Sequence, residues 1–177
     1  MMMVSGIGQF HTNEVGKDKR REYLTIGLSD IRALVDKPQS VDKAQAQWLI
    51  PSSVPSRNFK TQEEQGQFFM LWADLDKNPP TLPDLSVMVE GILGGCDFEL
   101  YNTKSATVKN QKTRLLIPLQ APLNGKDWLL AQGILNDKLE ALGIIPDRKN
   151  EGAGQLCYLP NKGEFYGRIA KRDGVLI

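Results

Sequence analysis

The spacing of apolar residues predicts a strand at residues 68–76 that is buried on both faces. Apolar side chains occupy every position from 68 to 73, whereas a half-exposed strand would alternate them with polar ones. The run ends in two acids, Asp74 and Asp76, and the strand-breaking residues 78–80 (Asn-Pro-Pro) follow. We therefore expect a strand that is covered on both sides and ends in a pair of carboxylates.

Two segments after this strand have helical patterns. Residues 81–93 begin with Thr81 as N-cap, Pro in the first turn and an acid three residues after the cap, and Gly-Gly ends them. Residues 125–142 repeat apolar side chains at intervals of three and four, and Gly143 follows as C-cap. We expect both segments to be helices that pack one apolar face on a sheet.

Further apolar runs predict strands at residues 98–101, 115–119 and 155–159. The resulting order, β-α-β-β-α-β, is that of a ferredoxin-like, split βαβ sheet, so the predicted class is α+β. Upstream, residues 23–35 are predicted as a strand turning into a short helix, and residues 48–51 as a short strand before a polar connection. Residues 1–22 are predicted as a loose, charged lead-in whose Arg20 and Arg21 either are solvated or touch phosphates.

Composition narrows the function classes. The 177 residues fit one domain, or a core with a small accessory lobe. The net charge of +1 excludes a strong positive electrostatic field over the whole molecule that would attract nucleic acid, but it leaves room for a local basic groove. Cys96 and Cys157 form no spacing motif, which favours buried thiols in a reducing cytoplasm. The single histidine, His11, excludes histidine-rich metal sites. No transmembrane stretch or signal peptide is recognised, so we expect a cytoplasmic protein without membrane contact.

The two acids at the end of the first strand are the main candidates for chemistry. Because side chains alternate along a strand, Asp74 and Asp76 point to the same side, about 6.5–7 Å apart along the backbone. Two neighbouring carboxylates can converge on a hard divalent ion such as Mg²⁺ or Mn²⁺. The alternative is a strand end that dips into water, where the acids help to start the Pro-Pro turn.

Cationic and hydroxyl side chains precede the neighbouring strand. In a ferredoxin-like sheet the first and third strands are neighbours, so Lys112 and Arg114 would face the acids, either as a structural ion-pair cluster or to bind phosphates. Lys104 and Ser105 lie in a predicted turn. It either binds phosphate or is a capped loop with a solvated lysine. Asp147 is either a third metal-binding carboxylate or a turn residue after Pro146.

These segments together resemble a known family. The chain resembles the primase-polymerase domain of the archaeo-eukaryotic primase superfamily, especially in replication proteins of plasmids, phages and other mobile elements. The resemblance lies in the order of residues 71–76, 101–106 and 112–119, followed by Asp147 before residues 155–160. The resemblance covers residues 48–166, the expected catalytic core, and we expect a lead-in with accessory elements over residues 1–47 and a tail over 167–177. The resemblance implies an RRM-like mixed sheet with flanking helices and a small accessory α/β unit.

The resemblance further implies a two-metal nucleotidyltransferase. Asp74, Asp76 and Asp147 match its catalytic, metal-binding acids, which take Mg²⁺ or Mn²⁺. Ser105 matches the serine of its second motif, and Arg114 the basic residue before the apolar-Pro-Leu strand; Lys104 and Lys112 are the remaining nucleotide-binding candidates. Where many relatives carry a histidine in the second motif, this chain has Lys104-Ser105-Ala106, and Lys104 would supply charge in its place.

Three hypotheses follow from these residues. The first is a primase or primase-polymerase domain that copies a single-stranded DNA template from nucleoside triphosphates, with a replicative helicase as a possible partner. The second is a catalytically inactive module that binds single-stranded DNA or an origin. The third is a metal-dependent nuclease that uses the same acids.

Overall fold

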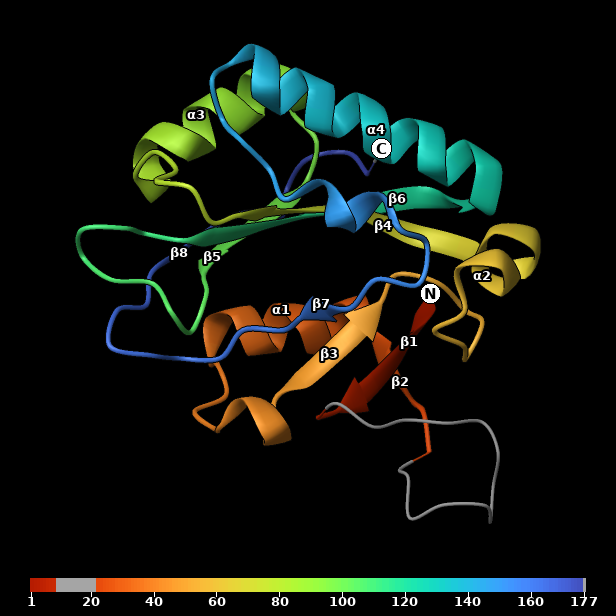
Figure 1. Ribbon diagram of the computed structural model, residues 1–177. Helices are drawn as coiled ribbons and strands as arrows, with labels where there is room; N and C mark the ends of the chain where they lie inside the picture. Colours follow the sequence, from red (N-terminus) through yellow and green to blue (C-terminus); the bar gives the residue numbers. More distant parts are fainter. Residues whose placement is uncertain (9–21, 177) are drawn as a thin grey trace.

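The computed structural model describes residues 1–8 and 22–176, which form two antiparallel sheets and their covering helices (Figure 1). His11, Arg20 and Arg21 lie outside the described residues. The predicted α+β class is confirmed. Within it, the pairings between the named strands are all antiparallel in the described part of the chain, rather than mixed.

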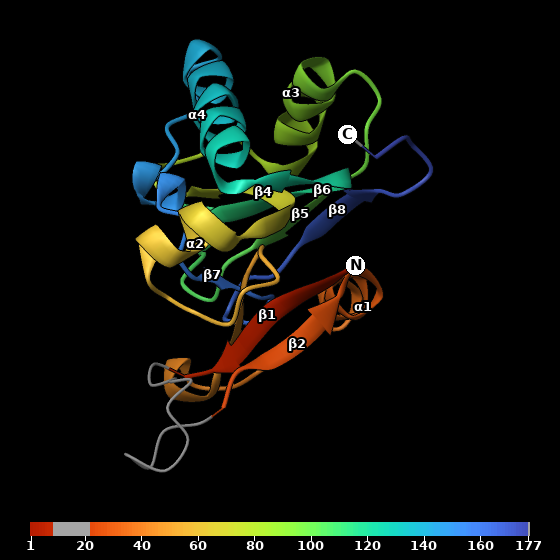
Figure 2. The ribbon, with the colours of Figure 1, turned by 90° about the vertical axis from the view of Figure 1, so that its right-hand side faces the viewer.

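The larger sheet has the strand order β4-β6-β5-β8. Its strands are β4 (Gln67–Leu75), β5 (Phe98–Asn102), β6 (Thr113–Asn124) and β8 (Arg168–Lys171). Helices α3 (Leu82–Leu93) and α4 (Gly125–Ala141) lie over one face of this sheet (Figure 2). Both helices form where the sequence predicts them, and Gly94 closes α3 in the left-handed conformation, with φ 60°.

The smaller sheet covers part of the opposite face, with the strand order β2-β1-β3-β7. Its strands are β1 (Met2–Ile7), β2 (Leu24–Gly27), β3 (Gln47–Ile50) and β7 (Cys157–Tyr158). The remaining elements are the helices α1 (Leu28–Asp36) and α2 (Phe59–Gln65) and the short 3₁₀ helices η1 (Lys43–Gln45) and η2 (Arg148–Glu151). The polar connection predicted before β4 therefore contains α2, which Asn58 caps by accepting a hydrogen bond from the Thr61 N–H.

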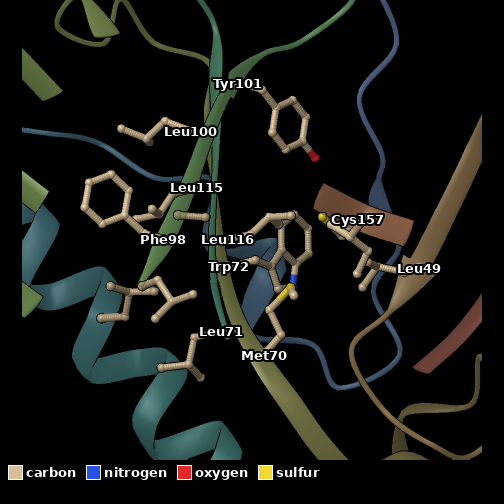
Figure 3. Close-up of a cluster of buried hydrophobic side chains, with 14 of the residues drawn as sticks. Leu49, Met70, Leu71, Trp72, Phe98, Leu100, Tyr101, Leu115, Leu116 and Cys157 are labelled. Atoms are coloured by element: carbon tan, nitrogen blue, oxygen red, sulfur yellow. The ribbon is translucent and has the colours of Figure 1, made fainter. Parts of the chain in front are cut away.

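Strand β4 is buried on both faces, as its apolar run predicts. Met70 and Trp72 point toward the smaller sheet, where Leu49 and Cys157 lie, whereas Leu71 points toward the helices (Figure 3). All five belong to one hydrophobic cluster that joins the two sheets. Alternation along the strand then directs the next polar side chain, Asp74, to the Trp72 side, between the sheets.

Helix α4 is fixed to β4 by polar side chains as well as apolar ones. The Trp128 indole donates to the Met70 carbonyl (2.9 Å). The Gln132 amide pairs with the backbone of Trp72, accepting from its N–H (3.2 Å) and donating to its carbonyl (2.7 Å). Because these groups are fully buried, the hydrogen bonds determine how α4 sits on the strand that carries the acids.

Two predictions about strands are wrong. Residues 155–159 were expected as the last strand of the core sheet, but β7 pairs with β3 in the smaller sheet, and β8 is the fourth strand of the larger one. The reason lies after α4: the Asp147 N–H donates one hydrogen bond to the Asp74 carbonyl (2.8 Å), and the chain then turns into η2 instead of extending along β4. The lead-in was expected to be loose, yet β1 within it is a central strand of the smaller sheet.

None of the helices in the described residues has the length and apolar character needed to cross a membrane.

Candidate functional site

The site forms where the end of β4 lies beside the start of β6. Asp74 lies opposite Arg114 in the strand register, so the first and third core strands are neighbours, as expected. The Arg114 Nη2 donates to Asp74 Oδ2 at 2.6 Å, and the two side chains are only 11% and 18% exposed. The Arg114 Nη1 donates to the Tyr158 carbonyl at 2.6 Å, which ties the site to the smaller sheet.

Burial and the neighbouring groups shift the pKa of Arg114 in opposite directions. Burial lowers the pKa of the guanidinium, but Asp74, Tyr101 and Cys157 together raise it by more, so the net pKa is raised and the group is always charged. The second carboxylate oxygen of Asp74, Oδ1, is buried without a hydrogen-bond partner among the described residues. Asp74 therefore has one oxygen held by Arg114 and one buried oxygen that lacks a partner among the described residues.

Asp76 is more exposed and only loosely paired. Its Oδ1 lies 3.8 Å from the Lys112 Nζ, and the two side chains are 46% and 29% exposed. Partial burial, followed by the neighbouring charge of Asp74, raises the pKa of the Asp76 carboxyl, and Asp147 adds to this effect. The acids thus create a local negative potential that a cation would relieve.

Asp147 lies next to this pair but has a structural role of its own. Its backbone N–H binds the Asp74 carbonyl, and its Oδ1 accepts from the Lys149 N–H (3.1 Å) at the start of η2. It lines a cavity together with Asp76. Among the described residues, however, no group of three or more His, Cys, Asp or Glu side chains is arranged to hold a metal ion. The assignment of all three acids as ligands therefore stays a prediction.

A cavity of about 410 Å³ opens between the two sheets, next to the acids. Its lining combines one acid with cations, hydroxyls and an aromatic ring. From the larger sheet and its loops come Asp76, Thr103, Lys104, Ser105 and Arg114; the other wall consists of Lys43, Ala46, Tyr158, Leu159 and Asn161. The cavity therefore joins residues more than a hundred positions apart in the chain.

Two of the predicted phosphate-binding side chains already bind other groups of the protein. Lys104 Nζ donates to the Val41 carbonyl, a neutral acceptor, and Arg114 is held by Asp74. Ser105 lies exposed in the turn at the cavity wall. Lys112 lies near Asp76, but it is not among the residues that line the cavity.

Sequence reasoning missed the wall that the smaller sheet contributes. Lys43 and Asn161 carry no motif, and Tyr158 was expected in the core sheet. A weak signal existed, since Tyr158 and Asn161 lie within and just after a predicted strand, and Lys43 lies a few residues before another. Their convergence depends on the pairing of β3 with β7, which no local pattern specifies.

Comparison with known proteins supports the fold. The archaeo-eukaryotic primase (AEP) domain of the primase-polymerase of cyanophage S-2L superposes with a TM-score of 0.53 and 13% sequence identity, over 99% of this chain and 83% of that one. No family model matches the sequence, and neither does any curated protein. At this identity the likeness concerns the fold alone. The chain shares the overall fold of that phage domain.

Proposed function

We propose that this protein is a primase-polymerase domain that joins nucleotides on a single-stranded DNA template in the replication of a mobile element. The observation that carries the proposal is the pair Asp74 and Asp76: Asp76 lines a cavity with cations and hydroxyls, and Asp74 is bound to Arg114, which lines the same cavity. Nucleotidyl transfer needs carboxylates for divalent ions and cations for a triphosphate, and both are present here. The likeness to a phage primase-polymerase domain agrees with this combination.

The carboxylates suit Mg²⁺ or Mn²⁺. Asp74 Oδ1 is buried and has no partner among the described residues, and Asp76 has a raised pKa because of burial and its acidic neighbours. Mg²⁺ is usually bound by one or two carboxylates, with water and substrate phosphates completing its shell, so a set of two acids with Asp147 beside them suffices. When bound, such ions supply charge stabilisation to the transferring phosphoryl group and lower the pKa of the attacking hydroxyl.

The remaining site residues would bind the nucleotide. Lys104 can exchange the Val41 carbonyl for a phosphate oxygen, a stronger partner because it is charged. Ser105 adds a hydroxyl from the same turn, and Lys112 adds charge near Asp76. Arg114 holds Asp74 in place and contributes positive charge at the cavity wall.

The direct test is primer synthesis on single-stranded DNA with labelled nucleotides and Mn²⁺. Asp76→Asn is the most informative variant, because Asp76 is partly exposed and its loss leaves no buried cation unpaired. We expect it to reduce product at least about a hundredfold. Asp84→Asn, which removes an exposed acid at the start of α3, is the matched control and should remain active.

The other two hypotheses are distinguished in the same assay. A binding module would give no product and would bind single-stranded DNA with a salt-dependent affinity that Asp76→Asn does not change. A nuclease would shorten the labelled strand in Mg²⁺ without nucleoside triphosphates. No labelled product from the wild type would refute the proposed polymerising activity. A helicase partner stays a prediction from the resemblance alone.

A further inference from the structure

We propose that Lys43, from the wall formed by the smaller sheet, binds the phosphates of the nucleotide in the cavity between the sheets. The inference rests on the proposed function, since it assigns a new residue to the same substrate site. Lys43 is the first residue of η1 and lines this cavity opposite Thr103 and Ser105. A nucleotide would then be held from both sheets rather than by the larger one alone.

Of the cationic side chains that line the cavity, Lys43 is the best candidate to bind phosphate, because the others already have protein partners. The Arg114 Nη groups are occupied by Asp74 and the Tyr158 carbonyl, and the Lys104 ammonium by the Val41 carbonyl. Lys43 is exposed, its Nζ lies 5.7 Å from the centroid of the Tyr158 ring, and no acid in the described part of the chain pairs with it. A cation over an aromatic ring keeps its hydrogen-bond donors, so Lys43 can engage an anion without losing an existing ion pair.

The loop before Lys43 is anchored to the opposite end of the chain. The Asn161 side chain accepts from the Val41 N–H (3.0 Å) and donates to the Val41 carbonyl (2.9 Å). The Gln39 N–H donates to the Pro160 carbonyl (3.1 Å). These hydrogen bonds hold the backbone on which Lys43 stands against the segment that carries Tyr158. The backbone that carries Lys43 is therefore fixed beside the cavity before any ligand arrives, which lowers the entropic cost of binding.

A buried hydroxyl on the opposite wall also lacks a partner. Thr103 is 7% exposed and lines the same cavity, and its Oγ1 is buried without a hydrogen-bond partner among the described residues. Buried polar groups are nearly always satisfied, so the Thr103 hydroxyl has a hydrogen bond left for a ligand or a water molecule in the cavity. Thr103 and Lys43 together would contact one ligand from two sides.

The test measures binding rather than turnover, by titrating dATP with Mg²⁺ into the whole chain in a calorimeter at low salt. Lys43→Ala should weaken dATP binding about fivefold to tenfold, as expected for a charge-assisted hydrogen bond, and Lys43→Arg should stay within about twofold of the wild type. Lys37→Ala is the control, because Lys37 is an exposed lysine of the same unit that lines a separate groove beside α1. With dAMP, which carries fewer phosphate charges, the effect of Lys43→Ala should be smaller.

Equal dATP affinity of the wild type and Lys43→Ala would overturn the inference, as would a wild type that binds no dATP. An equal loss in Lys37→Ala would also overturn it, since only general surface charge would then be involved. The two proposals fail separately. A protein that binds dATP through Lys43 but makes no primer refutes the proposed polymerase and leaves this site intact. Primer synthesis with unchanged dATP affinity in Lys43→Ala refutes only the role of Lys43.

Discussion

Replacement of Arg114 by Met tests how strongly the acid pair depends on its buried cation. The guanidinium binds Asp74 at 2.6 Å with both side chains largely buried. Methionine has a similar length but no charge, so Arg114→Met leaves the Asp74 carboxylate partly buried and uncompensated. Removal of one partner of a buried ion pair costs about 3–5 kcal/mol of unfolding free energy. We expect the lower end, about 3 kcal/mol, because Asp74 retains 18% exposure.

The assay is urea or thermal denaturation followed by circular dichroism. For a chain of this size, a loss of about 3 kcal/mol corresponds to a fall in Tm of roughly 6–12 °C. Lys112→Met is the matched control on the same side of the site, because Lys112 pairs with Asp76 at 3.8 Å and both side chains are much more exposed. Such a pair is worth at most about 1 kcal/mol.

Added Mn²⁺ connects this result to the proposed metal site. If Asp74 is a ligand, the ion replaces the missing positive charge, so Mn²⁺ should raise the Tm of Arg114→Met more than that of the wild type. A stability of Arg114→Met within about 1 kcal/mol of the wild type would refute the electrostatic reasoning. Equal stabilisation of both proteins by Mn²⁺ would place the ion away from Asp74.

Three further predictions concern the scaffold. Glu99 is fully buried between Arg32 and Arg172, so Glu99→Gln should lower the unfolding free energy by about 3 kcal/mol in urea denaturation. Glu90→Gln, in an exposed pair with Lys171, should lower it by less than about 1 kcal/mol, and equal losses would contradict the role of burial. Burial raises the pKa of the Cys157 thiol to about 12, so it stays protonated at neutral pH and should react with iodoacetamide only on unfolding; fast labelling of Cys157 itself in the native protein, read by peptide mapping because Cys96 is partly exposed, would disprove this. In α4, the carbon added by Gly133→Ala has no described atom within 4 Å outside the local helix backbone, so the substitution should stabilise the protein by about 0.5–1 kcal/mol, measured as a higher Tm.

The sequence predicts the core strands and helices well, because their signals are local. The unbroken apolar run before Asp74 marks a strand covered on both sides, and Pro83 and Gly94 delimit α3. The facing of Asp74 and Arg114 followed from the strand order of the split βαβ pattern. For these parts, hydrophobic periodicity and capping residues contain enough information.

The smaller sheet could not be predicted in the same way. An apolar run such as residues 155–159 fits either sheet, and pairing with Trp48 and Leu49 decides between them across more than a hundred residues. The same long-range pairing brings Lys43 to the cavity. The position of Asp147 is also non-local, because a single backbone hydrogen bond to Asp74 fixes it beside the acids. Chain segments this far apart meet only through tertiary packing, which leaves no trace in a short sequence window.

The chain visits the two sheets alternately: strands β1–β3 belong to the smaller sheet, β4–β6 to the larger one, β7 to the smaller one and β8 to the larger one. Neither sheet is therefore a single continuous segment that could unfold while the other stays folded. The hydrophobic cluster that the two sheets share also opposes partial separation. We expect heat to melt the protein in one cooperative step. A ligand that bridges the sheets would then protect every strand at once, so slower amide hydrogen exchange should reach even β2 and β8, which are edge strands of their sheets.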